Sequence, residues 1–245
     1  MKFSDLHLRV PLNDWEKTRR MIAKSFELGY SRVGVPLPPS TKQEIIDRLR
    51  RVCEEFGVDL VTRLELLPRS SSELLGSLRR FRRQFEVVSV LCVSKPLARQ
   101  AAKDRRVDLL SFPAVEPRKR FFDWAEAELA SRSKAAFEID LAQVLSVEGF
   151  SRIIFLSRLR KEVVTAKSYG VPVVLSSGAA DPLLLRKPQD YASLALLFGI
   201  EAPYALEALS TIPAGVVERN RLKQDADYVA PGIRIVRRKG SLENR

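Results

Sequence analysis

Residues 32–64 read RVGVPLPPSTKQEIIDRLRRVCEEFGVDLVTRL, two short apolar segments on either side of an amphipathic one. The apolar segments at 32–36 and 58–64 are typical of buried strands. Between them, Thr41 and Glu44 have the spacing of a capping box, and apolar residues then recur on one helical stripe until a glycine ends it. The stretch therefore predicts a strand, a helix and a second strand.

The same alternation of strand and helix repeats along the chain. An alternating segment at residues 3–8 precedes a helix that is capped by Asn13 or Asp14 and ended by Gly29. Four later apolar strands, separated by helical stretches, are expected at 87–93, 107–112, 135–141 and 171–176. Seven strand–helix units are visible in this way.

Short apolar strands separated by amphipathic helices require a parallel sheet, and seven or eight such units favour a closed, TIM-like (β/α) barrel. An open, doubly wound sheet is the alternative. The eighth unit is irregular, because the chain after Ser176 is mainly helical, and residues 232–236 could supply the last strand. We expect one barrel domain over residues 1–236 and a basic, flexible tail over 237–245.

Charge is the clearest functional signal in the composition. The 245 residues carry a formal net charge of +12 and a single histidine, His7. The charge favours a polyanionic partner such as nucleic acid, and the shortage of imidazoles argues against a histidine-based hydrolase. No segment has the length and apolarity of a membrane helix or a signal peptide, and Cys53 and Cys92 fit buried, reduced thiols, so we expect a cytoplasmic protein.

Polar residues at the carboxyl ends of the expected strands form a candidate site, because that end of a parallel barrel usually carries function. Carboxylates that converge with a histidine could hold a divalent metal and polarise a phosphate; alternatively they form a polar plug, hydrogen-bonded to one another. We favour the plug and expect no metal bound by the protein, since a hydrolytic metal site of this kind needs several imidazoles. The candidates are Asp5, His7, Glu65, Glu138, Asp140, Ser176 and Ser177.

A series of motifs, in order along nearly the whole chain, carries a family resemblance. The motifs are SDLH at 4–7, RVDLLSFP at 106–113, FEIDL at 137–141, PVVLSSGA at 172–179, RKPQD at 186–190, NRLK at 220–223 and YVAPGIR at 228–234. With them the chain resembles the ribonuclease P protein family that comprises archaeal component 3 and the eukaryotic thirty-kilodalton subunit. Phosphate-loop, dinucleotide, nucleophile-elbow and zinc-helix motifs are absent from the sequence.

That family is similar in turn to the polymerase-and-histidinol-phosphatase barrels, metal-dependent phosphoesterases whose opening motif is Asp-x-His-x-His. Here Asp5 and His7 survive, but Arg9 stands at the position of the second histidine. Glu138 looks like the relic of a metal-binding glutamate, and the late Ser-Asp-x-His motif corresponds to residues 176–179, where the aspartate and the histidine are missing. The resemblance implies that the multinuclear metal centre of those enzymes cannot form as such.

The resemblance implies a subunit of ribonuclease P, an endonuclease in which RNA, with Mg²⁺ held mainly by the RNA, removes the 5′ leader from precursor tRNA. The chain would bind the catalytic RNA and one small protein subunit as obligate partner, would meet precursor tRNA indirectly, and would not be catalytic alone. An archaeal source is expected. The alternative is a metal-dependent phosphoesterase that uses Asp5, His7, Glu138 and Asp140.

Clusters of basic residues are the candidates for RNA contact, because guanidinium groups match phosphate oxygens and stack on unpaired bases. A single basic cluster is more often a solvated helix face. The prediction of RNA binding therefore rests on the clusters taken together and on the net charge. The helix that bears the last three candidates could equally dock against a partner protein. The candidates are Arg118, Lys119, Arg120, Arg186, Lys187, Arg219, Asn220 and Lys223.

Overall fold

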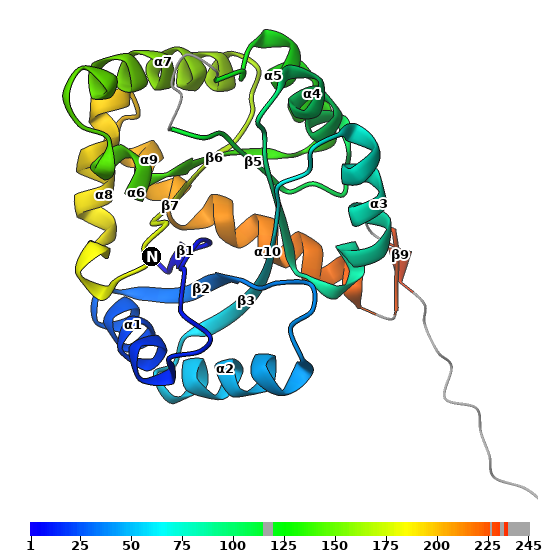
Figure 1. The fold of residues 1–245 in the computed structure, drawn as a ribbon, viewed down its shortest axis with the longest axis vertical. Helices are drawn as coiled ribbons and strands as arrows, with labels where there is room; N and C mark the ends of the chain where they lie inside the picture. The colour runs from blue at the N-terminus through cyan, green and yellow to red at the C-terminus, as the bar shows by residue number, and fades with distance from the viewer. Residues whose placement is uncertain (115–119, 226, 231–232, 235–245) are drawn as a thin grey trace, which may run out of the picture.

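The structure is a computed structural model that describes residues 1–114, 120–225, 227–230 and 233–234. Within these residues, seven parallel strands lie at the centre of the molecule and helices surround them (Figure 1). The strands are β1 (Phe3–Asp5), β2 (Tyr30–Pro36), β3 (Asp59–Leu66), β4 (Val87–Leu91), β5 (Leu109–Ser111), β6 (Ala136–Asp140) and β7 (Val173–Ser176).

Each strand of the barrel pairs in parallel with the next one along the chain, from β1 to β7. Val33 lies beside Leu60, for example, and Phe137 beside Val173. Parallel neighbours require crossover connections, and the helices supply them. The predicted TIM-like barrel is confirmed, and the doubly wound alternative is wrong, because its strand order would reverse at a switch point.

The helices form the outer layer of the barrel. Up to β7 they are α1 (Trp15–Glu27), α2 (Gln43–Glu55), α3 (Ser71–Phe81), the short η1 (Arg82–Gln84), α4 (Lys95–Lys103), α5 (Trp124–Ser133), α6 (Leu141–Ser146) and α7 (Gly149–Ser168). After β7 come η3 (Pro182–Leu184), α8 (Pro188–Ala195), η4 (Leu196–Phe198), α9 (Ala202–Ala208) and α10 (Thr211–Gln224).

Capping side chains set the starts of two outer helices. The Asp14 side chain accepts a hydrogen bond from the Lys17 N–H, so Asp14 is the cap of α1. Asp123 and Glu126 form a full capping box at the start of α5.

The capping box expected at Thr41 and Glu44 is wrong. Helix α2 begins after Lys42, which makes no side-chain cap. The Thr41 hydroxyl donates instead to the Pro38 carbonyl at 2.7 Å, because the turn before the helix brings that acceptor closer.

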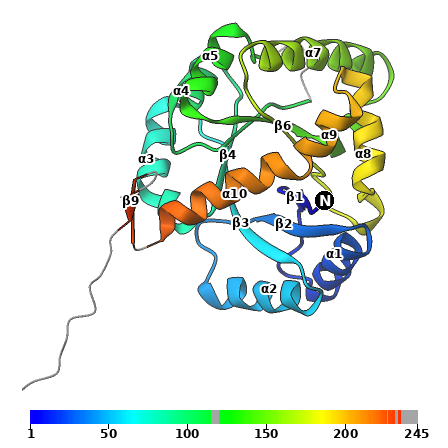
Figure 2. The same cartoon turned by 180° about the vertical axis from the view of Figure 1, so that it is seen from behind.

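Helix α10 takes the place of an eighth strand–helix unit and lies across one end of the barrel (Figure 2). Its apolar side packs on residues that lie at or near the first positions of several strands, which makes this the amino-terminal end of the barrel. The small cluster inside the barrel consists of Leu6, Val61, Val87, Leu109, Ala136, Val174, Val216 and Val217. The helix thus covers the apolar interior at the amino-terminal end of the barrel and keeps water out of it.

The expectation that residues 232–236 complete the barrel is wrong. Strand β9 (Ile233–Arg234) pairs antiparallel with β8 (Tyr228–Ala230) in a separate two-stranded sheet. The physical reason is that α10 crosses the end of the barrel and leads the chain to a position next to α3, away from the gap between β7 and β1 that an eighth strand would fill (Figure 1). The tail at 237–245 lies outside the described residues, so the predicted domain limits stay a prediction.

No single helix among the described residues has both the length and the apolarity to cross a membrane. Two consecutive helical segments, Pro188–Phe198 and Ala202–Gln224, reach the required length and apolarity only when they are taken together, and the chain bends by 120° between them.

Candidate functional site

Asp5 joins the first and the last strands of the barrel. Its carboxylate accepts a hydrogen bond from the Ser177 N–H at 2.9 Å and another from the Ser177 hydroxyl. The Arg9 N–H also donates to the Ala179 carbonyl at 2.9 Å. Because β1 and β7 share no strand pairing in the described residues, these contacts close the barrel at its carboxyl end. Burial raises the pKa of Asp5, and the Ser177 hydrogen bonds oppose that rise.

An ion pair between Arg63 and Glu138 lies inside the barrel. Both side chains are fully buried, and the Arg63 guanidinium donates to both carboxylate oxygens of Glu138, with an Nη2–Oε2 distance of 2.7 Å. The hydroxyls of Ser89 and Ser176 donate to the same carboxylate at 3.2 and 2.8 Å. The Leu6 carbonyl accepts from Arg63 at 2.9 Å. One ion pair therefore connects strands β3, β4, β6 and β7.

The charge of Arg63 is maintained by Glu138. Burial lowers the pKa of the guanidinium, but Glu138, followed by Glu65 and Asp140, raises it, and the net result is a pKa above its ordinary value. Arg63 is thus a fixed positive charge among the polar residues at the carboxyl end of the barrel, which we call the barrel mouth.

His7 is a neutral imidazole beside this pair. Its Nε2 accepts a 2.9 Å hydrogen bond from Arg9 Nε, which places the ring proton on Nδ1. Nδ1 lies 3.8 Å from an Asp140 oxygen and has no hydrogen-bond partner among the described residues. Burial, and then the charges of Arg63 and Arg9, hold the pKa of His7 well below its ordinary value. Burial also raises the pKa of Asp140 to about 6.

These residues do not fit a divalent metal. Both oxygens of Glu138 are held by the guanidinium of Arg63, and both oxygens of Asp5 are held by Ser177. A metal ion would have to displace Arg63 or share a buried space with its charge, which is costly. Within the described part of the chain, no group of three or more His, Cys, Asp and Glu side chains could hold a metal ion. At the barrel mouth, the positive charge of Arg63 neutralises the Glu138 carboxylate in place of a metal ion.

The turn after β7 completes the mouth. Gly178 has a φ of +62°, and a Cβ at this position would overlap the carboxylate of Asp140, so glycine is required there. A cavity of about 400 Å³ opens beside Arg9 and is lined also by Glu65 and Gln143. Glu65 lies within β3 and not after the strand as the sequence suggested.

The structure places Arg120 inside the molecule. One guanidinium nitrogen lies 2.6 Å from the Glu162 carboxylate, another donates to the Phe112 carbonyl at 3.1 Å, and 3% of the side chain is exposed. This differs from the surface position that contact with RNA requires, because the arginine ties the end of β5 to α7. Arg118 and Lys119 lie outside the described residues.

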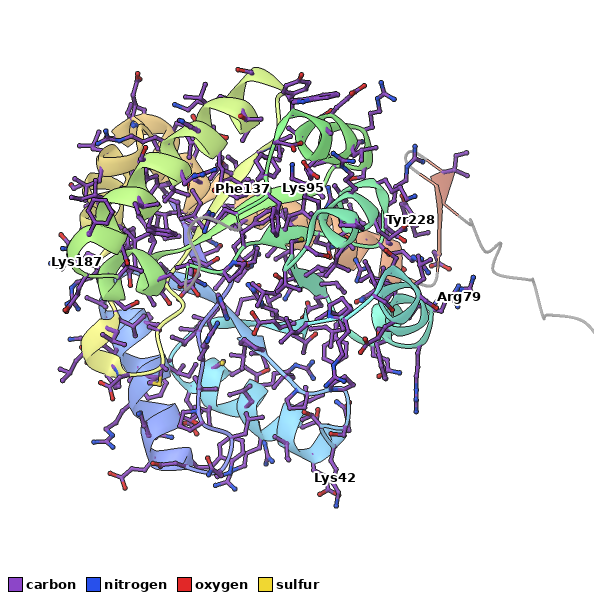
Figure 3. All side chains as sticks on the ribbon, turned by 45° about the horizontal axis from the view of Figure 1, so that its top comes forward. Lys42, Arg79, Lys95, Phe137, Lys187 and Tyr228 are labelled. Atoms are coloured by element: carbon purple, nitrogen blue, oxygen red, sulfur yellow. The ribbon has the colours of Figure 1, made fainter. Side chains whose placement is uncertain are left out.

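Arg186 and Lys187 lie in the segment that leads into α8. The Arg186 guanidinium donates to the Leu185 carbonyl at 2.9 Å, and both side chains are exposed. Lys187 lies at the opposite edge of the molecule from Arg79 in Figure 3, with Phe137 in the interior between them. Basic residues are therefore spread around the barrel, and contact of Arg186 and Lys187 with RNA stays a prediction.

The three candidates on α10 differ in exposure. Asn220 is fully buried, which again differs from the position that RNA contact requires, because α10 packs against the barrel at this residue. Arg219 is half-buried and lies 3.2 Å from Asp108, and Lys223 is exposed. Contact of Arg219 and Lys223 with RNA stays a prediction.

Sequence reasoning missed Arg63. The signal was present, since a lone arginine in the apolar strand segment 58–64 needs a buried carboxylate if it faces inward. Its partner Glu138 lies 75 positions away, and no local pattern pairs the two residues.

Comparison with known proteins shows relatives that align over most of the chain. Ribonuclease P protein component 3 of Methanococcoides burtonii is 28% identical over 95% of this chain and 93% of that protein. The protein of the same name from Methanothermobacter thermautotrophicus is 28% identical over 96% of each chain. The one from Methanosarcina mazei is 32% identical over 74% of each chain.

Solved structures share the fold. A chain from a cryo-EM structure of archaeal ribonuclease P with mature tRNA matches with a TM-score of 0.82 and 20% identity, over 97% of this chain and 100% of that one. A histidinol phosphate phosphatase from Lactococcus lactis matches with a TM-score of 0.51 and 11% identity, over 89% and 94%. The model of the family described as RNase P subunit p30 matches residues 2–225, and the chain therefore belongs to that family.

Proposed function

We propose that this chain is a protein subunit of ribonuclease P and supports the RNA-catalysed removal of the 5′ leader from precursor tRNA. The match of the family model over residues 2–225 carries the proposal. The names of the curated relatives, which align over most of their own lengths, support it.

The chemistry of the barrel mouth supports an accessory role for the protein. Phosphodiester hydrolysis by RNA depends on positioned metal ions, and we assign the Mg²⁺ ions to the RNA. A protein with a net charge of +12 neutralises phosphates and so lowers the Mg²⁺ concentration that the folded RNA needs. The phosphoesterase alternative has weaker support, because Arg63 occupies the carboxylate that a metal would use.

The proposed partners are the catalytic RNA, precursor tRNA through that RNA, and other protein subunits, with one small subunit as obligate partner. Two exposed apolar side chains in the first turns of α7 support a protein partner, since exposed apolar patches mark interaction sites. Phe150 is 71% exposed and Ile153 65%. We place the assembled particle in the cytoplasm.

The test is cleavage of precursor tRNA at limiting Mg²⁺ by the catalytic RNA with its small protein subunit, with and without this chain. The proposal expects strong stimulation by the chain and no cleavage by the chain alone. Unchanged cleavage on addition of the chain, or cleavage without any RNA, contradicts it.

The obligate small partner is tested separately. Size-exclusion chromatography of the chain with each small ribonuclease P protein in turn should give one stable complex. Omission of that protein from the cleavage reaction should remove the stimulation. Equal stimulation without it would contradict the obligate pairing.

A further inference from the structure

A buried carboxylate at the amino-terminal end of the barrel holds two arginines in place. Asp108 precedes β5 and has no exposed surface. Arg82 from η1 and Arg219 from α10 each place a guanidinium nitrogen 3.2 Å from its oxygens. The Val88 N–H donates to the same carboxylate at 2.9 Å. Asp108 thus fixes two cations that come from distant parts of the sequence.

Lys134 is a third basic residue, and its backbone lies beside Arg219. Arg219 donates to the Lys134 carbonyl at 3.0 Å, which holds the lysine beside it. Lys134 ends α5 in the left-handed conformation, with a φ of +68°, and it is the one non-glycine residue with a positive φ in the described part of the chain. This conformation is strained for a residue that has a side chain, so a glycine would be easier to accommodate at this position.

Lys223 is the fourth cation. It lies one helical turn beyond Arg219 on α10 and is exposed. Burial of part of its surface, followed by repulsion from Arg219, Arg82 and Lys134, lowers the pKa of its ammonium group, and Asp108 opposes the change. The geometry agrees: Arg82 and Arg219 share Asp108, the Lys134 backbone contacts Arg219, and Lys223 follows Arg219 by one turn.

These four side chains, which we call the basal cation cluster, are short of negative charge. Asp108 is the one carboxylate that pairs with any of them among residues 1–114, 120–225, 227–230 and 233–234. Four cations therefore share one anion. The neighbouring Arg221 differs, because Asp59 and Glu86 hold its guanidinium at 2.8 and 2.6 Å.

We propose that the basal cation cluster of Arg82, Lys134, Arg219 and Lys223 binds a phosphate group of an RNA backbone. Guanidinium forks and ammonium groups are the protein groups that match phosphate oxygens. Asp108 and the Lys134 carbonyl orient the two arginines before any ligand arrives, which reduces the entropy lost on binding. A phosphate also relieves the repulsion among the four charges.

The identity of the phosphate as RNA rests on the proposed function, and the net charge of +12 favours the same class of partner. A carboxylate of a partner protein is the other anion that the cluster could bind. The experiment below separates the two.

The test uses the double variant Lys134→Gln/Lys223→Gln, which leaves the two arginines on Asp108 and so avoids an uncompensated buried charge. The matched control is Lys42→Gln/Arg51→Gln, which removes two exposed charges from the region of α2. Binding of the full-length proteins to the catalytic RNA is measured at several salt concentrations, and thermal melting checks their folding.

The test variant should bind the RNA roughly tenfold more weakly than the control, with a salt slope smaller by about one to two. Acetylation of Lys134 and Lys223 in the unchanged protein should be suppressed by bound RNA, while acetylation of Lys42 should not. Equal binding of the two variants, with no protection of the two lysines, overturns the cluster as an RNA site.

The outcomes also separate this inference from the proposed function. If the unchanged chain neither binds the RNA nor stimulates cleavage, the proposed function itself fails. If it does both and the test variant behaves like the control, the inference alone fails. If the test variant keeps its RNA affinity but no longer associates with a protein subunit, the cluster binds a protein carboxylate and the inference is overturned.

Discussion

Arg63 carries a positive charge that has no access to water, and Glu138 is its compensation. An ion pair of this kind is a weak net source of stability, because both groups lose their hydration. Loss of one partner is a different matter, since the remaining charge stays buried without compensation. The pair therefore makes the barrel sensitive to single substitutions at either residue.

Substitution Glu138→Gln should destabilise the fold by about 3–5 kcal/mol, because it leaves the buried charge of Arg63 without its hydrogen-bonded carboxylate and with only the partly exposed Glu65, 3.7 Å away, as an ion partner. Chemical denaturation followed by circular dichroism measures the change. The matched control is Glu128→Gln, which breaks an exposed pair with Arg132 and should cost less than about 1 kcal/mol. A loss for Glu138→Gln as small as that of the control would contradict the role of the pair.

His7 should remain neutral well below the pH at which a free imidazole titrates. Because it is the sole histidine, its Hε1 proton gives a single signal to follow in an NMR titration. Burial and the charges of Arg63 and Arg9 predict no titration of that signal between about pH 7.5 and 5.5, where an unperturbed imidazole changes charge. The urea-unfolded chain is the control and should titrate normally. A folded-state midpoint near 6.5 would show that the ring is exposed.

The same shift has a consequence for stability. The pKa of His7 is lower in the folded state, so its contribution to stability is present above the unfolded pKa of 6.5 and is lost as the pH falls toward the folded pKa. Asp140 acts in the opposite sense. Its folded pKa is raised to about 6 from 3.8, so its contribution is present at low pH and is lost as the pH rises through about 6.

At the scale of secondary structure, α10 is the element that completes the barrel. Val216 and Val217 face the apolar interior, while Arg219 and Arg221 reach carboxylates at the rim. The helix therefore has an apolar contact and a polar contact with the same barrel end. Its removal would expose the small apolar cluster to water.

Substitution Val217→Asp should break the apolar contact between α10 and the barrel interior, since it places a carboxylate in a fully buried apolar position. We expect a loss of more than about 3 kcal/mol and a clear fall in the melting temperature, measured by calorimetry. Leu222→Asp on the same helix is the control, because Leu222 is 44% exposed, and it should change stability by about 0.5 kcal/mol or less. Similar losses for the two variants would show that α10 does not seal the barrel.

The sequence predicted the seven regular units because each one contains its own signal. Strand segments such as 32–36 and 58–64 are apolar and short, and the helix between them has an apolar stripe. The eighth unit could not be predicted in this way. The position of α10 depends on pairs such as Arg221 with Asp59, which are 162 residues apart, and no local periodicity encodes them.

At the scale of the whole molecule, the net charge of +12 predicts the type of partner but not where it binds. Arg120 shows why. In the sequence it is one of three consecutive basic residues, but in the fold its guanidinium is paired with Glu162 in the interior. The polar residues at the mouth were found because strand ends are visible in the sequence, whereas their pairing with Arg63 and Arg9 is visible in the fold alone.

Binding of the chain to its RNA should weaken steeply with salt. Neutralisation of four or more phosphates predicts a fall in affinity of roughly a hundredfold between about 50 and 200 mM monovalent salt. Filter binding at constant Mg²⁺ measures it, with the melting temperature recorded at each salt concentration as a control for folding. Affinity that is constant over this range would mean that the positive charge does not drive the association.

The contact between Asp5 and Ser177 also sets an order of events during synthesis. The two residues are 172 positions apart, so the ribosome releases the first strand long before the residue that holds it in the closed ring has been made. β1 pairs with β2 on one side, and until residue 177 has been made the contact that joins its other side to the end of β7 cannot form. Closure of the ring is therefore a late step of translation, and a nascent chain stalled before residue 177 would present an exposed strand edge to chaperones.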